Sequence, residues 1–353
     1  MIGERIKLAR QGKGMSLRRL AEVVKVSAQA ISKYERGLDV PSSGVLLRLA
    51  DALGVSIEYF FRTPKIGTIK PVYRKKTAFN KKQEHAILAE IRDWLERYLE
   101  VEMLVLSREK KFEVPSEIDF NVHSLEDVEK IAEELRNEWR LGLDPIENMT
   151  EMLENLGIKV GIVRGSETFD ACAFVLDDGP PVIVVKSGVP GDRQRFDLAH
   201  ELGHLLLRAR NGLDEEKIAF RFAGAFLVPA AVARSELGDK RRKLSLYELH
   251  FLKHKYGLSM QAWVYRAKDL GIISESTARA LFQQFRANGW HKKEPGDQYP
   301  SEEPGRMTRL IIRALAEEII SERRAAELLG RPLEVFLEEV ATKHGGFRAA
   351  VCD

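Results

Sequence analysis

The stretch FDLAHELGHLLL, residues 196–207, decides how the rest of the chain is interpreted. It places His200 and His204 four residues apart, with Glu201 directly after the first histidine. On a helix, residues i and i+4 share one face and lie roughly 6 Å apart, so both imidazoles can bind one metal ion. A carboxylate one position round the helix can take a proton from a water held by that metal. The pattern therefore predicts a metal-dependent hydrolytic site with Glu201 as general base.

A catalytic zinc site also needs a third protein ligand. Leu207 and Arg210 stand where a metzincin would carry a glycine and a third histidine, and no cysteine is close in sequence. The remaining option is a carboxylate from the next helix, expected within LDEEKIAFRFAGAFLVP, residues 213–229. Helical phase places more than one acidic residue above an inward line of apolar side chains. The candidates are Asp214, Glu215 and Glu216.

The sequence on either side of this helix predicts a small sheet and further helices. Residues 158–163, 170–176 and 180–186 are short, rich in β-branched residues and separated by turn residues, which favours three strands. Upstream, residues 87–99 repeat apolar side chains at helical spacing, and downstream the helical pattern continues to about residue 281. Gly203, inside the histidine helix, predicts close approach of another backbone or of a substrate.

The N-terminal end is basic and has the pattern of paired short helices. Residues 1–80 hold 16 Lys and Arg against 6 Asp and Glu, so this part carries +10 while the rest of the chain carries −7. In SLRRLAEVVKVSAQAISKYERG, residues 16–37, Ser16 and Ser27 can each cap a short helix. The second helix can lie in the major groove of DNA, where glutamine reads adenine. Its outward residues are Ala28, Gln29, Ser32 and Lys33.

Composition sets the broad class of the protein. The chain has 353 residues, 44% hydrophobic and 31% charged, which fits several globular domains. There is no run of 18 apolar residues and no apolar signal region, so we expect neither a membrane span nor a membrane partner. Cys172 and Cys352 are the two cysteines, which excludes a disulfide framework and an all-cysteine zinc site. This usage fits a reducing cytoplasm, where we expect the protein to act.

Residues 4–61 resemble the Cro/cI-type (XRE) helix-turn-helix family. The match rests on Ala21, Val26, Ile31 and the Glu35-Arg36-Gly37 sequence. The resemblance implies a five-helix domain that pairs as a homodimer on double-stranded operator DNA. It also implies that Gln29, Ser32 and Lys33 contact bases, with Arg18, Ser27 and Arg36 near phosphates.

Residues 124–270 resemble the ImmA/IrrE family of metallopeptidases, through RFDLAHELGHLLL and EKIAFRFAGAFLVP. In that family a glutamate lies thirteen residues before the proline of a Leu-x-Pro sequence. Counting back from Pro229, the resemblance implies Glu216 as the third ligand. The resemblance implies a zincin-like fold, a Zn²⁺ or Mn²⁺ cofactor and cleavage of a regulatory protein such as an XRE-type repressor. Phe220 departs from the pattern, because the family usually has a polar residue there.

Together these patterns predict a multidomain α and α+β chain. The expected parts are a helix-turn-helix domain (1–63), a linker (64–82), a connecting helix and extended segment (83–123), a metallopeptidase domain with a small sheet (124–285), and a loop with a helical extension (286–353). The predicted function is a DNA-binding transcriptional regulator with a zinc metallo-endopeptidase domain. The alternative is a non-enzymatic transcription factor or antitoxin, whose degenerate peptidase-like domain senses a ligand or mediates dimerisation.

Overall fold

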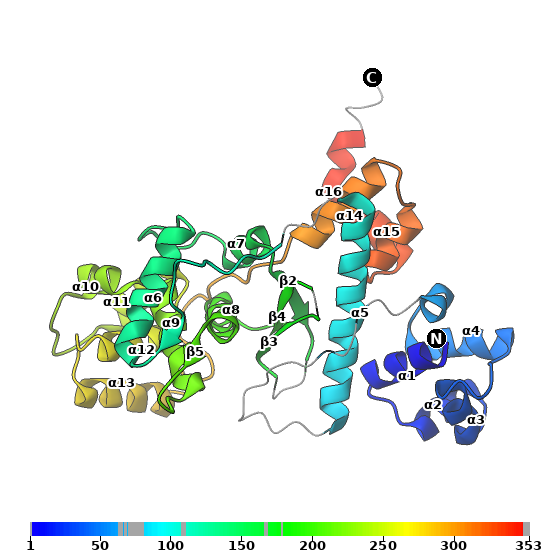
Figure 1. The fold of residues 1–353 in the computed structure, drawn as a ribbon, viewed down its shortest axis with the longest axis horizontal. Helices are drawn as coiled ribbons and strands as arrows, with labels where there is room; N and C mark the ends of the chain where they lie inside the picture. Colours follow the sequence, from blue (N-terminus) through cyan, green and yellow to red (C-terminus); the bar gives the residue numbers. More distant parts are fainter. Residues whose placement is uncertain are drawn as a thin grey trace.

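The computed structural model describes residues 2–62, 66, 69, 81–106, 111–165, 169–177 and 179–348. Figure 1 shows three parts in chain order: short helices at the N-terminus, an α+β part, and helices near the C-terminus. This is the predicted fold class. Most of the predicted linker, residues 64–82, lies outside the described residues.

The N-terminal part is a set of short helices around one apolar core. These are α1 (Ile2–Gly12), α2 (Leu17–Val24), α3 (Ala28–Glu35), α4 (Ser43–Leu53) and the 3-10 helix η1 (Ile57–Phe61). The hydroxyls of Ser16 and Ser27 accept hydrogen bonds from the backbone N–H three residues on, at 3.1 and 3.0 Å, and so cap α2 and α3 as predicted. The expected five-helix domain is present, but its fifth element is a 3-10 turn, a geometry typical of such short segments.

Helix α5 (Lys81–Val105) connects the three parts and begins inside the predicted linker (Figure 1). Its middle turns bury Ile91 and Leu95 against the sheet, and its later turns bury Tyr98 and Val101 against the C-terminal helices. The N-terminal part is attached to the same helix by a buried ion pair between Arg5 of α1 and Glu96.

The sheet contains β2 (Lys159–Val163), β3 (Ala171–Val175) and β4 (Pro181–Lys186), in the order β2-β4-β3. Strand β4 runs parallel to β2 and antiparallel to β3. All three strands lie within one residue of their predicted bounds. Gly161 leaves room for the ring of Trp94 on α5, because an added Cβ would lie 2.8 Å from that ring.

Both faces of the sheet are covered, which explains why its strands read as continuous apolar runs. On β4, Val182 and Val184 belong to the core shared with α5. Ile183 and Val185 point the other way and pack with the histidine helix α8 (Gly191–Leu206). Figure 1 shows α5 and α8 on opposite sides of the sheet.

Helices complete the α+β part beyond α8. They are α6 (Leu125–Glu138), α7 (Met149–Leu156), α9 (Glu215–Leu227), α10 (Ala230–Leu237), α11 (Leu246–Tyr256), α12 (Met260–Asp269) and α13 (Glu275–Ala287). A two-stranded parallel pair, β1 (Asn121–Val122) and β5 (Arg208–Ala209), joins the entry of α6 to the exit of α8. In the described part of the chain no single helix is long and apolar enough to span a membrane. The bent pair α9 and α10 meets that test by length and composition alone.

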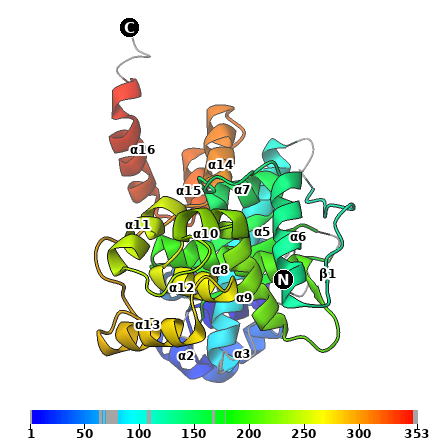
Figure 2. The same cartoon turned by 90° about the vertical axis from the view of Figure 1, so that its left-hand side faces the viewer.

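The C-terminal part returns to α5. After the segment 288–305 come α14 (Arg306–Ala316), α15 (Glu322–Leu329) and α16 (Leu333–Arg348). Ile311, Ala325 and Leu328 share a buried core with Tyr98 and Val101 of α5. Figures 1 and 2 both place α14–α16 at the end of the molecule opposite α2 and α3.

Candidate functional site

Helices α8 and α9 bring two histidines and a glutamate together. The Nε2 atoms of His200 and His204 lie 3.0 Å apart. Glu216 of α9 places Oε2 3.6 Å from Nε2 of His200 and Oε1 3.4 Å from Nε2 of His204. His200 is fully buried, whereas Glu216 retains 27% of its side-chain exposure. The cluster is therefore built into the protein but open on one side.

The spacing of these three side chains fits a metal ion. Two ligand atoms bound to one tetrahedral zinc are about 3.3 Å apart, and the observed separations lie on either side of that value. Among the described residues, this is the one group of three or more His, Cys, Asp or Glu side chains whose ligand atoms gather within 4.8 Å. Two imidazoles and a carboxylate are also a donor set that catalytic zinc accepts.

The local sequence explains how the two helices approach so closely. An added Cβ at Gly203 would lie 3.4 Å from Cα of Ala219 and 3.0 Å from the ring of Phe222, both on α9. A Cβ at this position would require the Phe222 ring to shift. The close backbone approach expected at Gly203 is thus confirmed.

The three acidic candidates for the third ligand occupy different places. Asp214 caps α9, because its Oδ1 accepts hydrogen bonds from the N–H groups of Glu216 at 3.0 Å and Lys217 at 3.4 Å. Glu215 is exposed in the first turn of the helix. Glu216 alone of the three lies in the histidine cluster.

Glu201 is almost fully buried, at 1% exposure, on the same helix as the two histidines. It lies close enough to Cys172 of β3 to affect that thiol. Burial raises the pKa of Cys172 well above its ordinary value, and the charge of Glu201 raises it further. Glu201 is therefore buried beside β3 and away from bulk water, on the helix that carries both histidines.

Phe220 is the departure from the family pattern, and it forms part of the site. Its ring centroid lies 4.5 Å from that of His200 and 5.9 Å from that of Phe196. Phe220 is still 46% exposed, so it covers His200 while leaving one face toward solvent. An apolar side chain here limits the access of water to the histidine ring.

Helix α12 carries two polar side chains of the kind that could stabilise an oxyanion, Arg266 and Tyr265. The guanidinium of Arg266 donates to both carboxylate oxygens of Glu129, at 2.5 and 2.6 Å, and to the carbonyl of Val228 at 2.8 Å. Tyr265 is 52% exposed and stacks near Phe282. Arg266 therefore has a structural role, and Tyr265 lines a pocket that the sequence did not predict.

The second histidine pair lacks a carboxylate partner of this kind among the described residues. His250 and His254 on α11 have ring centroids 4.7 Å apart, much as His200 and His204 do. Nε2 of His254 instead lies 3.1 Å from the carbonyl oxygen of Asp297. The equal spacing of the two pairs makes His250 and His254 a natural control.

The predicted DNA-contacting residues lie on α2, α3 and their ends. Arg18, Ser27, Gln29, Lys33 and Arg36 are exposed. Ser32 and Ala28 are half-buried, and Ala28 packs against the core of the N-terminal part. Arg36 donates from Nε to the carbonyl of Ser32 at 3.2 Å, which holds its side chain beside the end of α3. The exposed set is therefore available on α3, at its two ends and on the neighbouring helix α2.

The fold and the site define a two-part class of protein: a helix-turn-helix domain joined to a peptidase-like α+β domain. Comparison with known families agrees. Residues 6–60 match the helix-turn-helix family model, and residues 153–268 match that of the IrrE N-terminal-like domain. The chain thus carries an XRE-type helix-turn-helix domain and an IrrE/ImmA-like domain, as both resemblances predicted.

The chain is similar over a short stretch to curated proteins described as HTH-type transcriptional regulators. The chain is 43% identical over 60 residues to the uncharacterized HTH-type transcriptional regulator RP497 of Rickettsia prowazekii, covering 17% of this chain and 46% of that protein. It is 37% identical over 62 residues to the SPbeta prophage-derived uncharacterized HTH-type transcriptional regulator YonR of Bacillus subtilis, covering 18% and 57%. The chain spans about half the length of these relatives.

One solved structure aligns along most of the chain. The apo form of ComR from S. thermophilus covers 93% of this chain and 98% of its own, at 15% identity. The TM-score of this alignment is 0.17.

Proposed function

We propose that this chain is a DNA-binding transcriptional regulator whose IrrE/ImmA-like domain is a metal-dependent endopeptidase. The observation that supports it most is the gathering of His200, His204 and Glu216 on a helix in which Glu201 follows the first histidine. The substrate class we propose is a regulatory protein such as an XRE-type repressor. The cytoplasm is the compartment that suits such a regulator.

In this proposal each side chain has one task. His200, His204 and Glu216 hold a Zn²⁺ or Mn²⁺ ion. Such an ion, when bound, lowers the pKa of a water molecule to about 7 and polarises the peptide carbonyl. Glu201 accepts the proton of the attacking water and then donates it to the leaving amine. Phe220 and the buried surroundings of His200 limit the access of bulk water, which strengthens these electrostatic effects.

Metal content tests the ligand set directly. We expect about one Zn²⁺ or Mn²⁺ per chain, measured by inductively coupled plasma mass spectrometry after dialysis. His204→Ala should weaken metal binding by more than about 100-fold, because even an outer-shell partner is worth about 10- to 100-fold. The matched control is His254→Ala, from the pair with the same spacing, which should retain the metal. Equal metal loss in both variants would contradict the assignment.

At the other end of the chain we propose that α3 reads operator DNA. Gln29, Ser32 and Lys33 would contact bases, and Arg18, Ser27 and Arg36 would lie near phosphates. A homodimer would place two copies of α3 about 34 Å apart on a two-fold operator. The net charge of +10 over residues 1–80 suits a polyanion at this end.

Operator affinity should depend on α3. Gln29→Ala should cost about 1–3 kcal/mol of binding free energy and relax the preference at one base pair. Lys33→Ala should weaken binding and reduce the slope of log K against log salt by about 0.9 for each phosphate that the lysine neutralises. Lys130→Ala, an exposed lysine on α6, is the control. A nuclease footprint and titration that do not change with Gln29→Ala and Lys33→Ala would rule out α3 as the recognition helix.

A further inference from the structure

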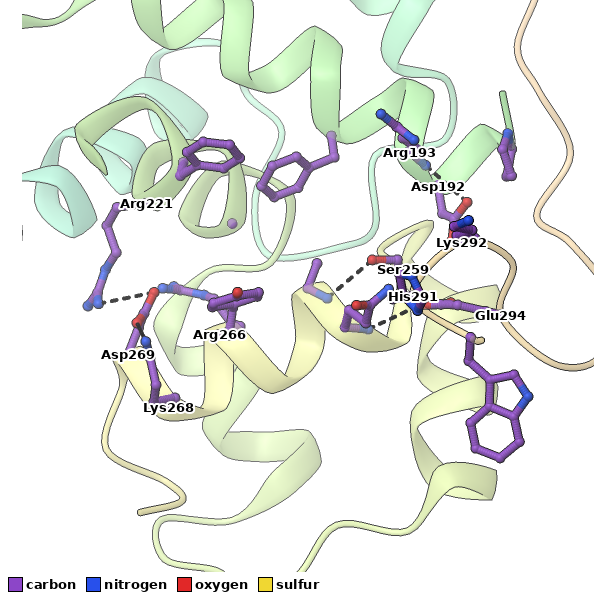
Figure 3. Close-up of a pocket in the computed structure, with 18 of the residues that line it drawn as sticks. Asp192, Arg193, Arg221, Ser259, Arg266, Lys268, Asp269, His291, Lys292 and Glu294 are labelled. Carbon is purple, nitrogen blue, oxygen red and sulfur yellow. Dashed lines mark hydrogen bonds and ion pairs between the residues drawn. The ribbon is translucent and has the colours of Figure 1, made fainter. Parts of the chain in front are cut away.

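A cavity of about 620 Å³ adjoins the histidine cluster. It lies between α8 and α9 on one side and α12 on the other, and the 288–305 segment closes one end (Figure 3). Phe196, Phe220 and Tyr265 contribute aromatic surface, and Gly224 leaves space in the wall. No motif in the sequence predicted this pocket.

Helical phase ties the pocket to the proposed metal ligands. Phe196 precedes His200 by four residues on α8, and Phe220 follows Glu216 by four residues on α9. Each phenylalanine therefore lies one helical turn, about 5.4 Å, from a cluster residue and on the same face. The rings of Phe196 and Phe220 contact each other across α8 and α9, as His200 and Glu216 do one helical turn away. The pocket is consequently the next position along the groove between the two helices.

Most charged groups that line the pocket are already paired. At one side Arg221 and Arg266 share the carboxylate of Glu129, with Nε of Arg221 at 2.5 Å from Oε1. Burial alone would raise the pKa of Glu129, but these two guanidiniums outweigh that effect and lower it. Arg221 and Lys268 also pair with Asp269, at 3.6 and 3.7 Å. Figure 3 shows Arg221, Arg266, Lys268 and Asp269 together at one side of the pocket.

On the opposite side of the pocket, one buried lysine pairs with the acidic side chains. Nζ of Lys253, which is fully buried, lies 3.2 Å from Asp192 and 3.1 Å from Glu294. The carboxylate of Glu294 also accepts the N–H groups of Met260 and Gln261, at 3.1 and 3.0 Å, at the start of α12. The acidic groups on this side are therefore satisfied within the protein.

What remains around the pocket is positive charge. Lys217, Lys292 and Lys293 line it and form no ion pair with the described residues, and both lysines of the 292–293 pair are exposed. Arg193 has a partner in Asp170, at 2.6 Å, but is itself exposed. A ligand that complements this surface would carry an apolar or aromatic group, which packs against Phe196 and Phe220. It would also carry carboxylates, which pair with the lysines.

We propose that this pocket is a specificity site of the peptidase, which binds an aromatic or large apolar side chain of the substrate flanked by acidic residues. This inference rests on the proposed function, because it takes the cluster as the place of cleavage. An extended peptide advances about 3.3 Å per residue, so the bound side chain would lie one or two residues from the cleaved bond. The basic linker of this chain, residues 64–82, would by its charge be a poor substrate.

Peptide binding tests the site separately from catalysis. The protein is the full-length, zinc-loaded Glu201→Gln variant, and the readout is fluorescence anisotropy of fluorescein-labelled peptides. Their centres are Glu-Glu-Phe-Glu-Glu, Lys-Lys-Phe-Lys-Lys and Glu-Glu-Ala-Glu-Glu. We expect the first peptide to bind at least about tenfold more tightly than the other two, from charge complementarity and from burial of the phenyl ring. Its affinity should fall as salt rises.

Two variants locate that binding in the pocket. Lys292→Ser/Lys293→Ser should weaken the acidic phenylalanine peptide about three- to tenfold. Gly224→Leu should weaken it about tenfold without changing charge, because the added side chain fills the cavity. The matched control is Arg242→Ser/Lys243→Ser, an exposed basic pair outside the pocket. Each variant is first checked for metal content and operator binding, so a folding defect is recognised.

The results separate the two proposals. Equal affinity for the three peptides, or equal weakening by the control pair, would overturn the specificity site. The same holds if Lys292→Ser/Lys293→Ser and Gly224→Leu leave binding unchanged. Selective binding that depends on the pocket supports the site even where wild-type protein cuts nothing, and in that case only the endopeptidase proposal fails.

Discussion

Glu201→Gln should abolish cleavage while the metal stays bound. Glutamine has nearly the shape of glutamate but accepts no proton, so only the general base is lost. A positioned base contributes about 10²- to 10⁴-fold to such a reaction. The measurement is single-turnover cleavage of a panel of purified XRE-type repressors by wild type and variant, each with its metal content determined.

The burial of Glu201 makes this substitution informative. At 1% exposure its carboxylate has little contact with bulk water, so water cannot easily replace it as proton acceptor. Glu215→Gln is the matched control, because Glu215 is exposed in the first turn of α9, next to the proposed ligand Glu216. It should leave cleavage within about twofold of wild type, as is usual for surface substitutions.

Three results would bear on the proposal in different ways. Cleavage that survives in Glu201→Gln would defeat the general-base assignment. Wild-type protein without metal would exclude the endopeptidase altogether and favour the non-enzymatic alternative. Metal without cleavage of any tested repressor would leave His200, His204 and Glu216 as a metal site and remove the proposed substrate class.

The parts of the fold that follow from local pattern could be predicted. The strand of residues 180–186 reads as continuous apolar sequence because Ile183 and Val184 are buried against different helices. The caps of α2 and α3 followed from Ser16 and Ser27, whose hydroxyls act on neighbours three residues away. Gly203 predicted that another part of the protein or a substrate approaches this helix closely, but the sequence did not show that it is α9.

The third cluster residue shows where local reasoning ended. Asp214, Glu215 and Glu216 are consecutive, so small differences in helical phase separate them. The family resemblance selected Glu216, and the position of α9 over α8 explains why it alone reaches the histidines. The capping role of Asp214 also depends on where the helix begins.

The pocket and the segment that closes it could not be predicted, because their contacts join distant residues. The sequence indicated only a loop for residues 288–305. In the structure, buried ion pairs hold this segment in place. Lys253 pairs with Glu294, which is 41 residues away in sequence, and Arg195 pairs with Glu302, which is 107 residues away. A charged residue in a Pro- and Gly-rich stretch gives no local sign that it will be buried.

Glu302→Ala should therefore destabilise the peptidase-like domain by about 3–5 kcal/mol, the usual cost of removing one partner of a buried ion pair. Arg195 of α8 is fully buried and binds the carboxylate of Glu302. The same carboxylate accepts hydrogen bonds from N–H and Oγ1 of Thr150, at 2.8 and 3.0 Å. Without it, a guanidinium and a backbone N–H remain buried with fewer partners.

Urea unfolding followed by tryptophan fluorescence measures this effect, since Trp263 is buried in that domain. The control is Glu303→Ala, the next residue, whose exposed side chain should matter by less than about 0.5 kcal/mol. Arg195→Met/Glu302→Leu should recover most of the lost stability, because the cost comes from the unpaired charge rather than from the missing attraction. If Glu302→Ala and Glu303→Ala unfold at the same urea concentration, the 288–305 segment does not hold α8, and the wall it gives the pocket is not fixed.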